Sequence, residues 1–301
     1  MKCDLHVHSY FSGQCTTPFA RKFCRESYND PEEVYSLLKR RGMNLFTLTD
    51  HDSIEGAEKL RSRPGFFLSE ELTCRMPSGT EVHVGVYDFH ERQHVQLQQR
   101  RNDLVSLLMY LSERRLFFSI NHVFSSLTGR REREDFAWFQ EYFPAVETRN
   151  GHMLPEANEH AAMFAKQWDK IAIGGSDAHA MPSVGTAFTE VRGARDKDEF
   201  FAGLRAGMGR VGGESGNFRK LTRDVLSIAG EMMREKTWTA LLSPLALLIP
   251  AITWFNYCDE RSFNRRWAAE VLDQPQSRKR PRWVTVPRPV PQTAMGESLC
   301  P

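Results

Sequence analysis

The chain has 301 residues, of which 41% are hydrophobic, so it can bury the core of one large or two modest globular domains. Its 40 basic and 38 acidic residues leave a net charge of only +2, which excludes a global field for nucleic acid or an anionic membrane, so any anion recognition must be local. The six cysteines include no CxxC pair and the N-terminus has no apolar signal segment, so we expect a reducing, cytoplasmic location and no cysteine-bound structural zinc.

Short apolar runs alternate with longer helical patterns up to about Gly213, which indicates an α/β architecture and favours a barrel. One helix is well marked, because Asp30 is placed to cap it, Pro31 suits its first position and Gly42 follows its basic last turn. Apolar residues at spacings of three and four predict further helices near residues 93–114 and 156–168. The predicted strands are residues 4–7, 45–48, 66–68, 82–86, 117–120, 146–148 and 171–173.

The character of the chain changes after Glu214. A helical pattern over residues 221–236 leads into the uncharged run 239–255, which Pro244 and Pro250 interrupt. This run is short for a membrane span, which needs about 20 predominantly apolar residues. Three interpretations stay open: a span, a segment that lies in a membrane interface or pairs with a partner protein, and a buried terminal helix pair.

A basic run follows at residues 261–266, so the whole region 239–266 is a candidate for membrane or protein contact. The last residues are rich in proline and arginine and poor in core-forming residues, which predicts a disordered tail. We therefore divide the chain into a barrel domain at 1–213, a helical extension at 214–272 and a disordered tail at 273–301.

The residues that can carry chemistry form five groups, beginning near the N-terminus. His6 and His8 are two residues apart, so on an extended strand both imidazoles face the same side and can ligate one metal. Asp50, His51 and Asp52 follow the second predicted strand, where three adjacent titratable groups would be costly to bury without a metal or other partners. The competing interpretations are a surface histidine pair and a polar turn in which Asp50 caps the next helix.

Two further groups lie in the middle of the chain. Glu70 and Glu71 end one predicted strand, and His83 lies within the next one. A histidine inside an apolar strand is often a hydrogen-bonded core residue, but the neighbouring carboxylates favour a metal ligand. His122 directly follows another predicted strand.

The last group is Asp177 and His179, which follow Gly174 and Gly175; the two glycines would let the backbone turn tightly into a site. All five groups thus recur at successive predicted strands, whose carboxyl ends are where a (β/α) barrel collects its active-site residues. Imidazoles and carboxylates without thiolates suit Zn, Mn or Fe. Eight of these residues are the candidate ligands: His6, His8, His51, Glu71, His83, His122, Asp177 and His179. They are too many for one ion, so we expect two or three ions that share a bridging carboxylate.

In this order the motifs resemble those of the polymerase and histidinol phosphatase (PHP) superfamily: HxH, then TDHD, a glutamate, two separated histidines and a final DxH. The resemblance does not cover the chain after Glu214. It implies a distorted, TIM-like (β/α)7 barrel with a trinuclear cluster at its carboxyl face. By motif position, the first ion would be held by His6, His8, Glu71 and Asp177, the second by Glu71 with His83 and His122, and the third by His51 and His179.

One position departs from the family pattern. Many relatives carry Ser-Asp-Gly after HxHS, and that aspartate joins the third metal, whereas Gly13 stands here between Ser12 and Gln14. The metal count is therefore left at two or three.

The expected chemistry is hydrolysis of a phosphate ester. Two metals about 3.5–4 Å apart can lower the pKa of a bridging water towards 7, and the resulting hydroxide would attack the phosphorus in line. Asp50, Asp52 and His179 are the candidates for the group that protonates the leaving oxygen. Arg149 and Asn150, at a predicted strand end, are the candidates for binding the phosphate.

The predicted substrate is a small phosphomonoester or nucleotide, and no stretch of interleaved basic and aromatic residues in the barrel domain indicates a nucleic-acid groove. A nuclease is therefore ranked lower. Two further functions stay open: an amidohydrolase acting on a C–N bond, and a metal-binding scaffold with reduced activity, for which Gly13 is the main support.

Overall fold

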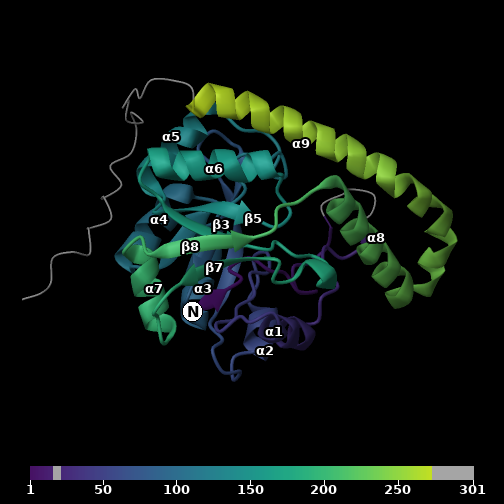
Figure 1. The fold of residues 1–301 in the computed structure, drawn as a ribbon, viewed down its shortest axis with the longest axis horizontal. Coiled ribbons are helices and arrows are strands. Elements are labelled where there is room, and N and C mark those ends of the chain that lie inside the picture. Colours follow the sequence, from purple (N-terminus) through teal and green to yellow (C-terminus); the bar gives the residue numbers. More distant parts are fainter. Residues whose placement is uncertain (16–21, 273–301) are drawn as a thin grey trace, which may run out of the picture.

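The computed structural model describes residues 1–15 and 22–272, so the predicted tail at 273–301 lies outside the described residues. The described chain is a mixed α/β fold with two sheets, which helices surround (Figure 1). One sheet has the order β1-β7-β8, with antiparallel pairs formed by β1 (Lys2–Cys3), β7 (Ala187–Val191) and β8 (Gly209–Gly213). The other sheet has the order β2-β3-β4-β5-β6, formed by β2 (Ser69–Arg75), β3 (Glu81–Tyr87), β4 (Phe117–Ile120), β5 (Ala145–Asn150) and β6 (Ile171–Gly175).

The predicted seven-stranded barrel is not seen as a closed barrel among the described residues. Strands β2, β3 and β4 pair antiparallel, and only β4, β5 and β6 pair parallel. The predicted strand at residues 4–7 is replaced by a segment held largely by side chains, because the Asp4 carboxylate accepts hydrogen bonds from the backbone N–H groups of Ser176 and Gly185. That segment still lies beside β6, through a single bridge between Val7 and Ala178.

The other predicted strands have mixed outcomes. Residues 82–86, 117–120, 146–148 and 171–173 all lie within observed strands, β3 to β6. The runs 45–48 and 66–68 form no named strand and pair with each other only through an isolated bridge, Phe46 to Phe66, and β2 begins after them at Ser69. Strands β7 and β8 were not predicted.

The helices follow their local signals. In α1 (Pro31–Arg40) the Asp30 side chain accepts hydrogen bonds from the backbone N–H groups of Glu32 and Glu33, as predicted for a cap. The pattern at 93–114 is two helices, α3 (Glu91–Arg100) and α4 (Leu104–Glu113), because Asp103 caps the second. The remaining helices of the body are α2 (Glu55–Lys59), α5 (Arg133–Tyr142), α6 (Pro155–Gln167) and α7 (Lys197–Arg205).

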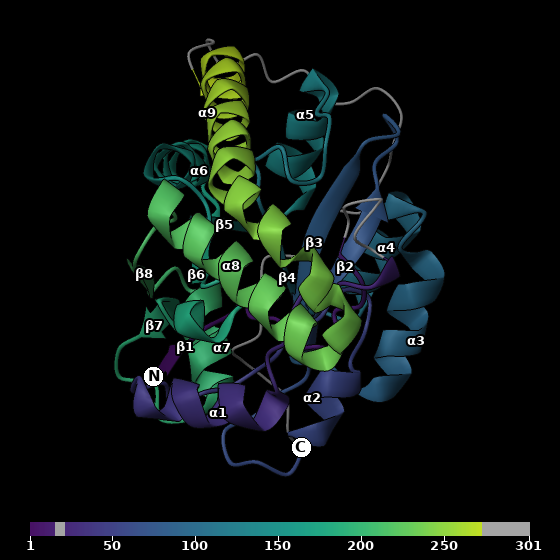
Figure 2. The same ribbon diagram turned by 90° about the vertical axis from the view of Figure 1, so that its right-hand side faces the viewer.

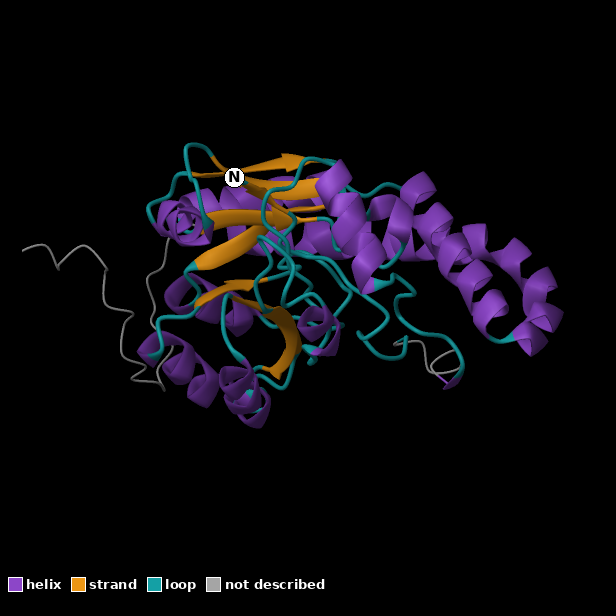
Figure 3. Ribbon diagram, turned by 90° about the horizontal axis from the view of Figure 1, so that it is seen from below, coloured by secondary structure: helices purple, strands orange, loops and turns teal. Residues whose placement is uncertain are grey.

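The helical extension forms a hairpin arm that projects from the body (Figures 1 and 3). It consists of α8 (Phe218–Glu235), a 3-10 helix at Thr237–Leu248 and α9 (Ile249–Leu272). Figure 2 shows the far half of α9 beside α5 and α6, where Trp267 and Val271 join the core of the body. The arm is therefore anchored at both ends, and near its turn it also meets the loop before α1, where Arg25 pairs with Glu235 and Phe23 contacts Trp238.

The turn of the arm contradicts the interpretation of 239–255 as a buried helix pair. Leu241, Leu247 and Phe255 are 85%, 83% and 72% exposed, because the contacts that the described body makes near the turn are to Glu235, Lys236 and Trp238. By length and composition alone, Thr237–Leu272 is one helical run that could cross a membrane, and only 11% of its most apolar window is buried. The second half of this run, however, packs against the body through Trp267.

Candidate metal centre

The HxH segment directs two buried imidazoles at the same two carboxylates. The Nε2 atom of His6 lies 3.1 Å from Glu71 Oε2 and 3.4 Å from Asp177 Oδ1. The Nε2 atom of His8 lies 3.5 Å and 3.4 Å from the same two oxygens. These four side chains are the ones that the family resemblance assigned to the first ion.

Glu71, on β2, lies between the first group and a second one. Its Oε1 atom is 3.2 Å from His122 Nε2 and 3.6 Å from His83 Nδ1. The adjacent Glu70 points to the opposite side of the strand, where it contacts His94 at 2.9 Å. Only Glu71 of the two glutamates therefore faces the histidines.

The third group contains a residue that the sequence did not reveal. The rings of His51 and His179 both lie next to the His8 ring, with centroids 4.7 Å and 4.3 Å from it and 6.3 Å from each other. The Glu26 carboxylate reaches both, at 3.6 Å from His51 Nε2 and 3.7 Å from His179 Nε2. Glu26 thus supplies an acid to the group in which Gly13 cannot take part. Because Glu26 follows no predicted strand and belongs to no spacing pattern, its only sequence signal was its position between HxH and the capped helix.

The donor set fits divalent ions. Among the described residues, four buried imidazole nitrogens have no hydrogen-bond partner, although buried polar atoms are normally paired: His8 Nε2, His51 Nδ1, His83 Nδ1 and His179 Nε2. Four sets of three ligand atoms each lie within 4.8 Å of one another around this cluster. Nitrogen and carboxylate donors without thiolate match Zn, Mn or Fe.

The pKa shifts separate the ligand types. Burial lowers the pKa of His179 to about 3 and that of His83 to about 4, so both are neutral imidazoles, the form that binds a metal. Burial opposes ionisation of Glu71, yet His6, His83 and His51 hold its pKa well below the usual range. Burial, followed by the charges of Glu71, Asp177 and Asp50, raises the pKa of Glu26 to about 8. The ionised form of Glu26 would therefore be stabilised by a nearby cation.

A buried carboxylate and an amide orient the ligands from behind. Glu147 Oε1 lies 2.7 Å from His6 Nδ1, and its Oε2 atom lies 3.4 Å from His122 Nδ1, which leaves both Nε2 atoms facing the cluster. The Asn150 amide donates to Glu147 at 2.9 Å and to Asp177 at 3.1 Å. Glu147 was not predicted, and Asn150, predicted to bind phosphate, is already engaged in this network.

The two aspartates proposed as proton donors are likewise engaged. The Asp50 carboxylate accepts from Ser9 and from Ser12, whose hydroxyl lies 2.9 Å from His8 Nδ1. Asp50 therefore positions His8. Asp52 accepts from the backbone N–H of Thr73 and pairs with Arg101 at 2.5 Å, so neither oxygen faces the cluster.

Arg149 donates to the Ser215 hydroxyl at 2.7 Å, next to the end of β8. Its role in phosphate binding stays a prediction.

The backbone at the site is constrained. His122 and Asp177 have φ angles of 51° and 53°, a left-handed conformation that costs energy for residues other than glycine. Position 175 needs a glycine for close packing rather than for the expected tight turn, because a Cβ there would lie 2.3 Å from the His6 backbone nitrogen. Gly175 therefore allows β6 to pass close beside the HxH segment.

Comparisons with known proteins cover parts of the chain. A family model described as PHP-associated matches residues 155–208. The uncharacterized protein MJ1587 of Methanocaldococcus jannaschii is 27% identical over 82 residues, and the match covers 27% of this chain and 44% of that protein. The chain thus matches less than half the length of this relative.

Two solved structures are similar in fold. PsfC from Pseudomonas syringae PB-5123 has a TM-score of 0.53 and 17% identity, with 77% of this chain and 98% of that chain covered. The lesion-specific endonuclease PfuEndoQ from Pyrococcus furiosus has a TM-score of 0.49 and 16% identity, with 70% and 57% covered. At these identities the similarity to PsfC supports the fold alone.

Proposed function

We propose that the chain is a member of the PHP superfamily and that it hydrolyses a phosphate ester at the cluster of imidazoles and carboxylates, with two or three divalent ions of Zn, Mn or Fe. The observation that carries this proposal is the set of unpartnered imidazole nitrogens that face shared carboxylates. Glu26 favours three ions over two, since it completes the group of His51 and His179.

Bound ions would supply Lewis-acid activation of water and neutralise the charge on the phosphoryl oxygens. The chain's own residues hold the geometry: Glu71 joins the groups, while Glu147 contacts the Nδ1 atoms of His6 and His122 and so fixes the two imidazoles from behind. We expect His6, His8 and His122 to be rigid, because the Nδ1 atom of each ring is held by Glu147, Ser12 or Asn150 while its Nε2 atom faces the cluster.

We expect the substrate to approach from the edge formed by the third group and His83. The side chains of His51, His83, His179 and Glu26 are 14%, 15%, 16% and 20% exposed, whereas His6 and Glu71 are at most 1% exposed. His179 is a neutral imidazole suited to a ligand, and Asp50 and Asp52 are held by other partners. We therefore assign the leaving-group proton to none of these three side chains.

The function is tested by turnover of a panel with Mn, Zn or Fe: small phosphomonoesters, nucleotides, phosphodiesters, single-stranded DNA and N-acyl amides. We expect phosphomonoesters or nucleotides to be hydrolysed, and His8→Ala to abolish the activity together with bound metal. The matched control is His90→Ala, since His90 is exposed and outside the cluster. If the fully metallated protein turns over no phosphate ester, the proposal fails, and amide turnover would favour an amidohydrolase.

We further propose a cytoplasmic protein whose arm contacts a membrane interface through residues 239–255. Leu241 and Leu247 are among the most exposed apolar side chains of the described chain. Exposed apolar surface of this kind marks a protein or membrane contact. Because α9 is packed on the body at Trp267, the arm can dip its turn into an interface but cannot span a bilayer while that packing holds.

A further inference from the structure

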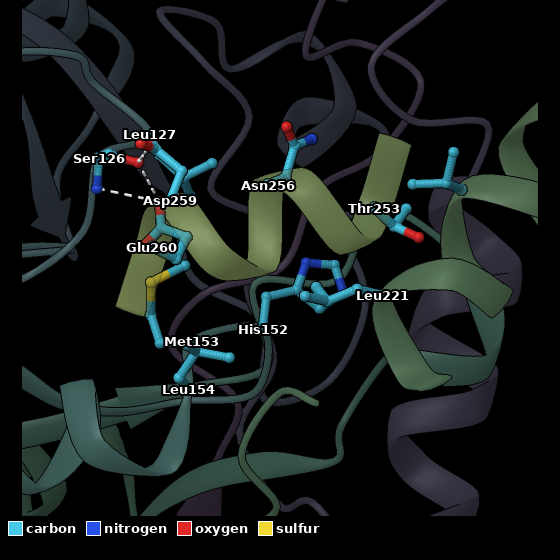
Figure 4. A pocket seen from close by; sticks show the side chains of 11 residues that line it. Ser126, Leu127, His152, Met153, Leu154, Leu221, Thr253, Asn256, Asp259 and Glu260 are labelled. Carbon is cyan, nitrogen blue, oxygen red and sulfur yellow. Dashed lines mark hydrogen bonds between the residues drawn. The ribbon is translucent and has the colours of Figure 1, made fainter. Parts of the chain in front are cut away.

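Two features next to the metal centre lie outside the proposed chemistry. One is a cavity of about 440 Å³ between the body and the arm, with His152 in its wall (Figure 4). None of the described residues that line this cavity belongs to the metal centre. The other feature is the antiparallel pairing of residues 13–15 with residues 24–26, which we call the N-terminal ladder. The ladder carries Glu26 of the third group, so a change in the ladder acts directly on the metal centre.

The N-terminal ladder places two cysteines opposite each other. Gln14 and Arg25 form an antiparallel bridge, and the backbone N–H of Cys15 donates to the Cys24 carbonyl at 3.1 Å. Side chains of directly opposed residues on antiparallel strands lie on the same face. The Cα atoms of such residues are about 4.5–5.5 Å apart, within the range of about 4.4–6.8 Å that a disulfide requires. Cys15 and Cys24 can therefore be linked without a large movement of the backbone.

Both cysteines are thiols in the structure, and their side chains are hydrogen-bonded to each other. Burial, followed by the neighbouring Cys15 thiol, raises the pKa of Cys24 to about 11. Cys24 is 8% exposed, whereas Cys15 is more accessible, so a solute reaches Cys15 first. Cys15 is thus the thiol that meets an oxidant, and Cys24 is the one that closes the link.

The ladder has two strands with different support. The backbone N–H of Glu26 donates to the Gly13 carbonyl at 3.1 Å, and the Glu26 carboxylate lies 3.6 Å and 3.7 Å from the two histidines of the third group. The strand that carries Glu26 is also held by the arm, because the Lys236 ammonium donates to the Phe23 carbonyl at 3.1 Å. A covalent link across the ladder would tie residues 13–15 to this held strand.

We propose that Cys15 and Cys24 form a reversible disulfide that controls how firmly the third group holds its metal ion. In the reduced protein, local opening separates the two strands and carries Glu26 away from the histidines. The disulfide removes these open states, so it keeps Glu26 in place. Disulfides of cytoplasmic proteins are usually transient and redox-sensing, which agrees with the expected reducing location. The disulfide itself does not depend on the proposed function, whereas its effect on the ion rests on the proposed metal centre.

The oxidant is a small disulfide, such as glutathione disulfide. The Cys15 thiolate attacks one of its sulfur atoms, which breaks the S–S bond, forms a mixed disulfide and releases one thiolate. The Cys24 sulfur then attacks the Cys15 sulfur and releases the second thiolate. The two cysteine protons pass to the released thiolates, so the protein loses two electrons and one glutathione disulfide becomes two glutathione molecules.

The link is tested on metal-free protein that carries Cys258→Ser and Cys300→Ser, which remove the exposed cysteine of α9 and the cysteine of the tail. This parent protein is equilibrated with glutathione disulfide, its remaining thiols are alkylated, and its tryptic peptides are mapped by mass spectrometry. Trypsin cuts after Arg21 and Lys22, so only a disulfide holds the two cysteine peptides of the ladder together. We expect the linked peptides to be the main oxidised species and to separate with dithiothreitol.

The effect on the ladder is measured with and without metal. In the metal-free protein, hydrogen exchange of the Glu26 backbone N–H should slow by about tenfold or more on oxidation. In the metallated protein, one ion should pass to a chelator about tenfold or more slowly from the oxidised than from the reduced form. Cys15→Ser in the same parent should abolish both differences. The parent itself, compared in its two redox states, needs no substitution in the ladder.

The outcomes separate this inference from the proposed function. Mixed disulfides with glutathione in place of the linked peptides, or no oxidation by excess glutathione disulfide, would overturn the disulfide. Linked peptides with unchanged exchange of the Glu26 N–H, or with unchanged loss of the ion, would overturn its control of the third group. If the protein binds no metal, the proposed function fails, while the mapped link and the Glu26 exchange still decide whether the disulfide forms and holds the ladder.

Discussion

Replacing Glu26 by glutamine tests whether this residue is a metal ligand. Burial and the neighbouring carboxylates raise its pKa from 4.5 to about 8. The native metal-free protein therefore keeps a proton on Glu26 up to about pH 8, whereas the unfolded chain releases it near 4.5. Because the native state binds more protons in this window, Glu26 lowers the free energy of unfolding as the pH rises from 4.5 to 8.

The size of the effect follows from the shift. At roughly 1.4 kcal/mol per pKa unit, the difference between 4.5 and about 8 corresponds to about 5 kcal/mol when Glu26 is fully ionised. Glutamine has a similar shape and no charge, so metal-free Glu26→Gln should become more stable than the wild type as the pH rises, approaching this difference. Titration of the nearby histidines affects both proteins in a similar way and largely cancels in the comparison.

Bound metal should reverse the order of stability, so that the wild type becomes more stable than Glu26→Gln. A carboxylate ligand beside His51 and His179 would gain from a cation, and glutamine would lose that interaction. We therefore expect metallated wild type to hold one more ion per chain than Glu26→Gln and to gain more stability from metal.

The assay is urea unfolding at pH 5, 6, 7 and 8 with chelator and with metal, together with the ion content per chain. Glu134→Gln, on the exposed surface of α5, is the control and should change neither measurement. Equal ion content and parallel pH profiles for wild type and Glu26→Gln would refute the reasoning.

The remaining predictions concern residues behind the cluster and the arm. Glu147→Gln should weaken metal affinity by about 10–100-fold while the protein stays folded, measured by competition with a chelator, and unchanged affinity would remove its orienting role. Asp52→Asn should lower the free energy of unfolding by about 1 kcal/mol without changing kcat/KM, since Asp52 pairs with Arg101. If the variant instead loses one limb of the pH–rate profile, Asp52 is the proton donor after all. The wild type should float with phosphatidylcholine vesicles in a density gradient, and the double variant Leu241→Glu/Leu247→Glu should not. Met163→Glu, at another exposed apolar side chain, is the control. The membrane contact is rejected if the wild type does not bind vesicles, or if it forms a dimer that the double variant abolishes.

Local rules account for the parts of the molecule that the sequence predicted. The helix α1 and the strands β3 to β6 were predicted from capping residues and apolar runs that lie within a few residues of each other in the sequence. The grouping of His6 and His8 with Asp177 followed from two side chains at a spacing of two and from motif order along the chain. In the structure both imidazoles lie 3.4 Å from the Asp177 carboxylate.

The sequence alone could not identify the partners that come from far along the chain. Glu147 contacts His6 across 141 positions of sequence, and Glu26 reaches His179 from a loop that carries no periodic pattern. Such contacts depend on how the segments are brought together in space, which spacing does not encode.

Composition, periodicity and motif order are local properties, and they were enough to predict an α/β chain with one ordered set of imidazoles and carboxylates and an apolar extension. The tertiary structure was needed to learn that the strands form two sheets without a closed barrel, that Glu26 lies beside His51 and His179, and that the apolar turn of the arm is exposed. The reason is that burial and proximity are set by the packing of the whole chain, and the body packs against the ends of the arm but leaves Leu241 and Leu247 of its turn exposed.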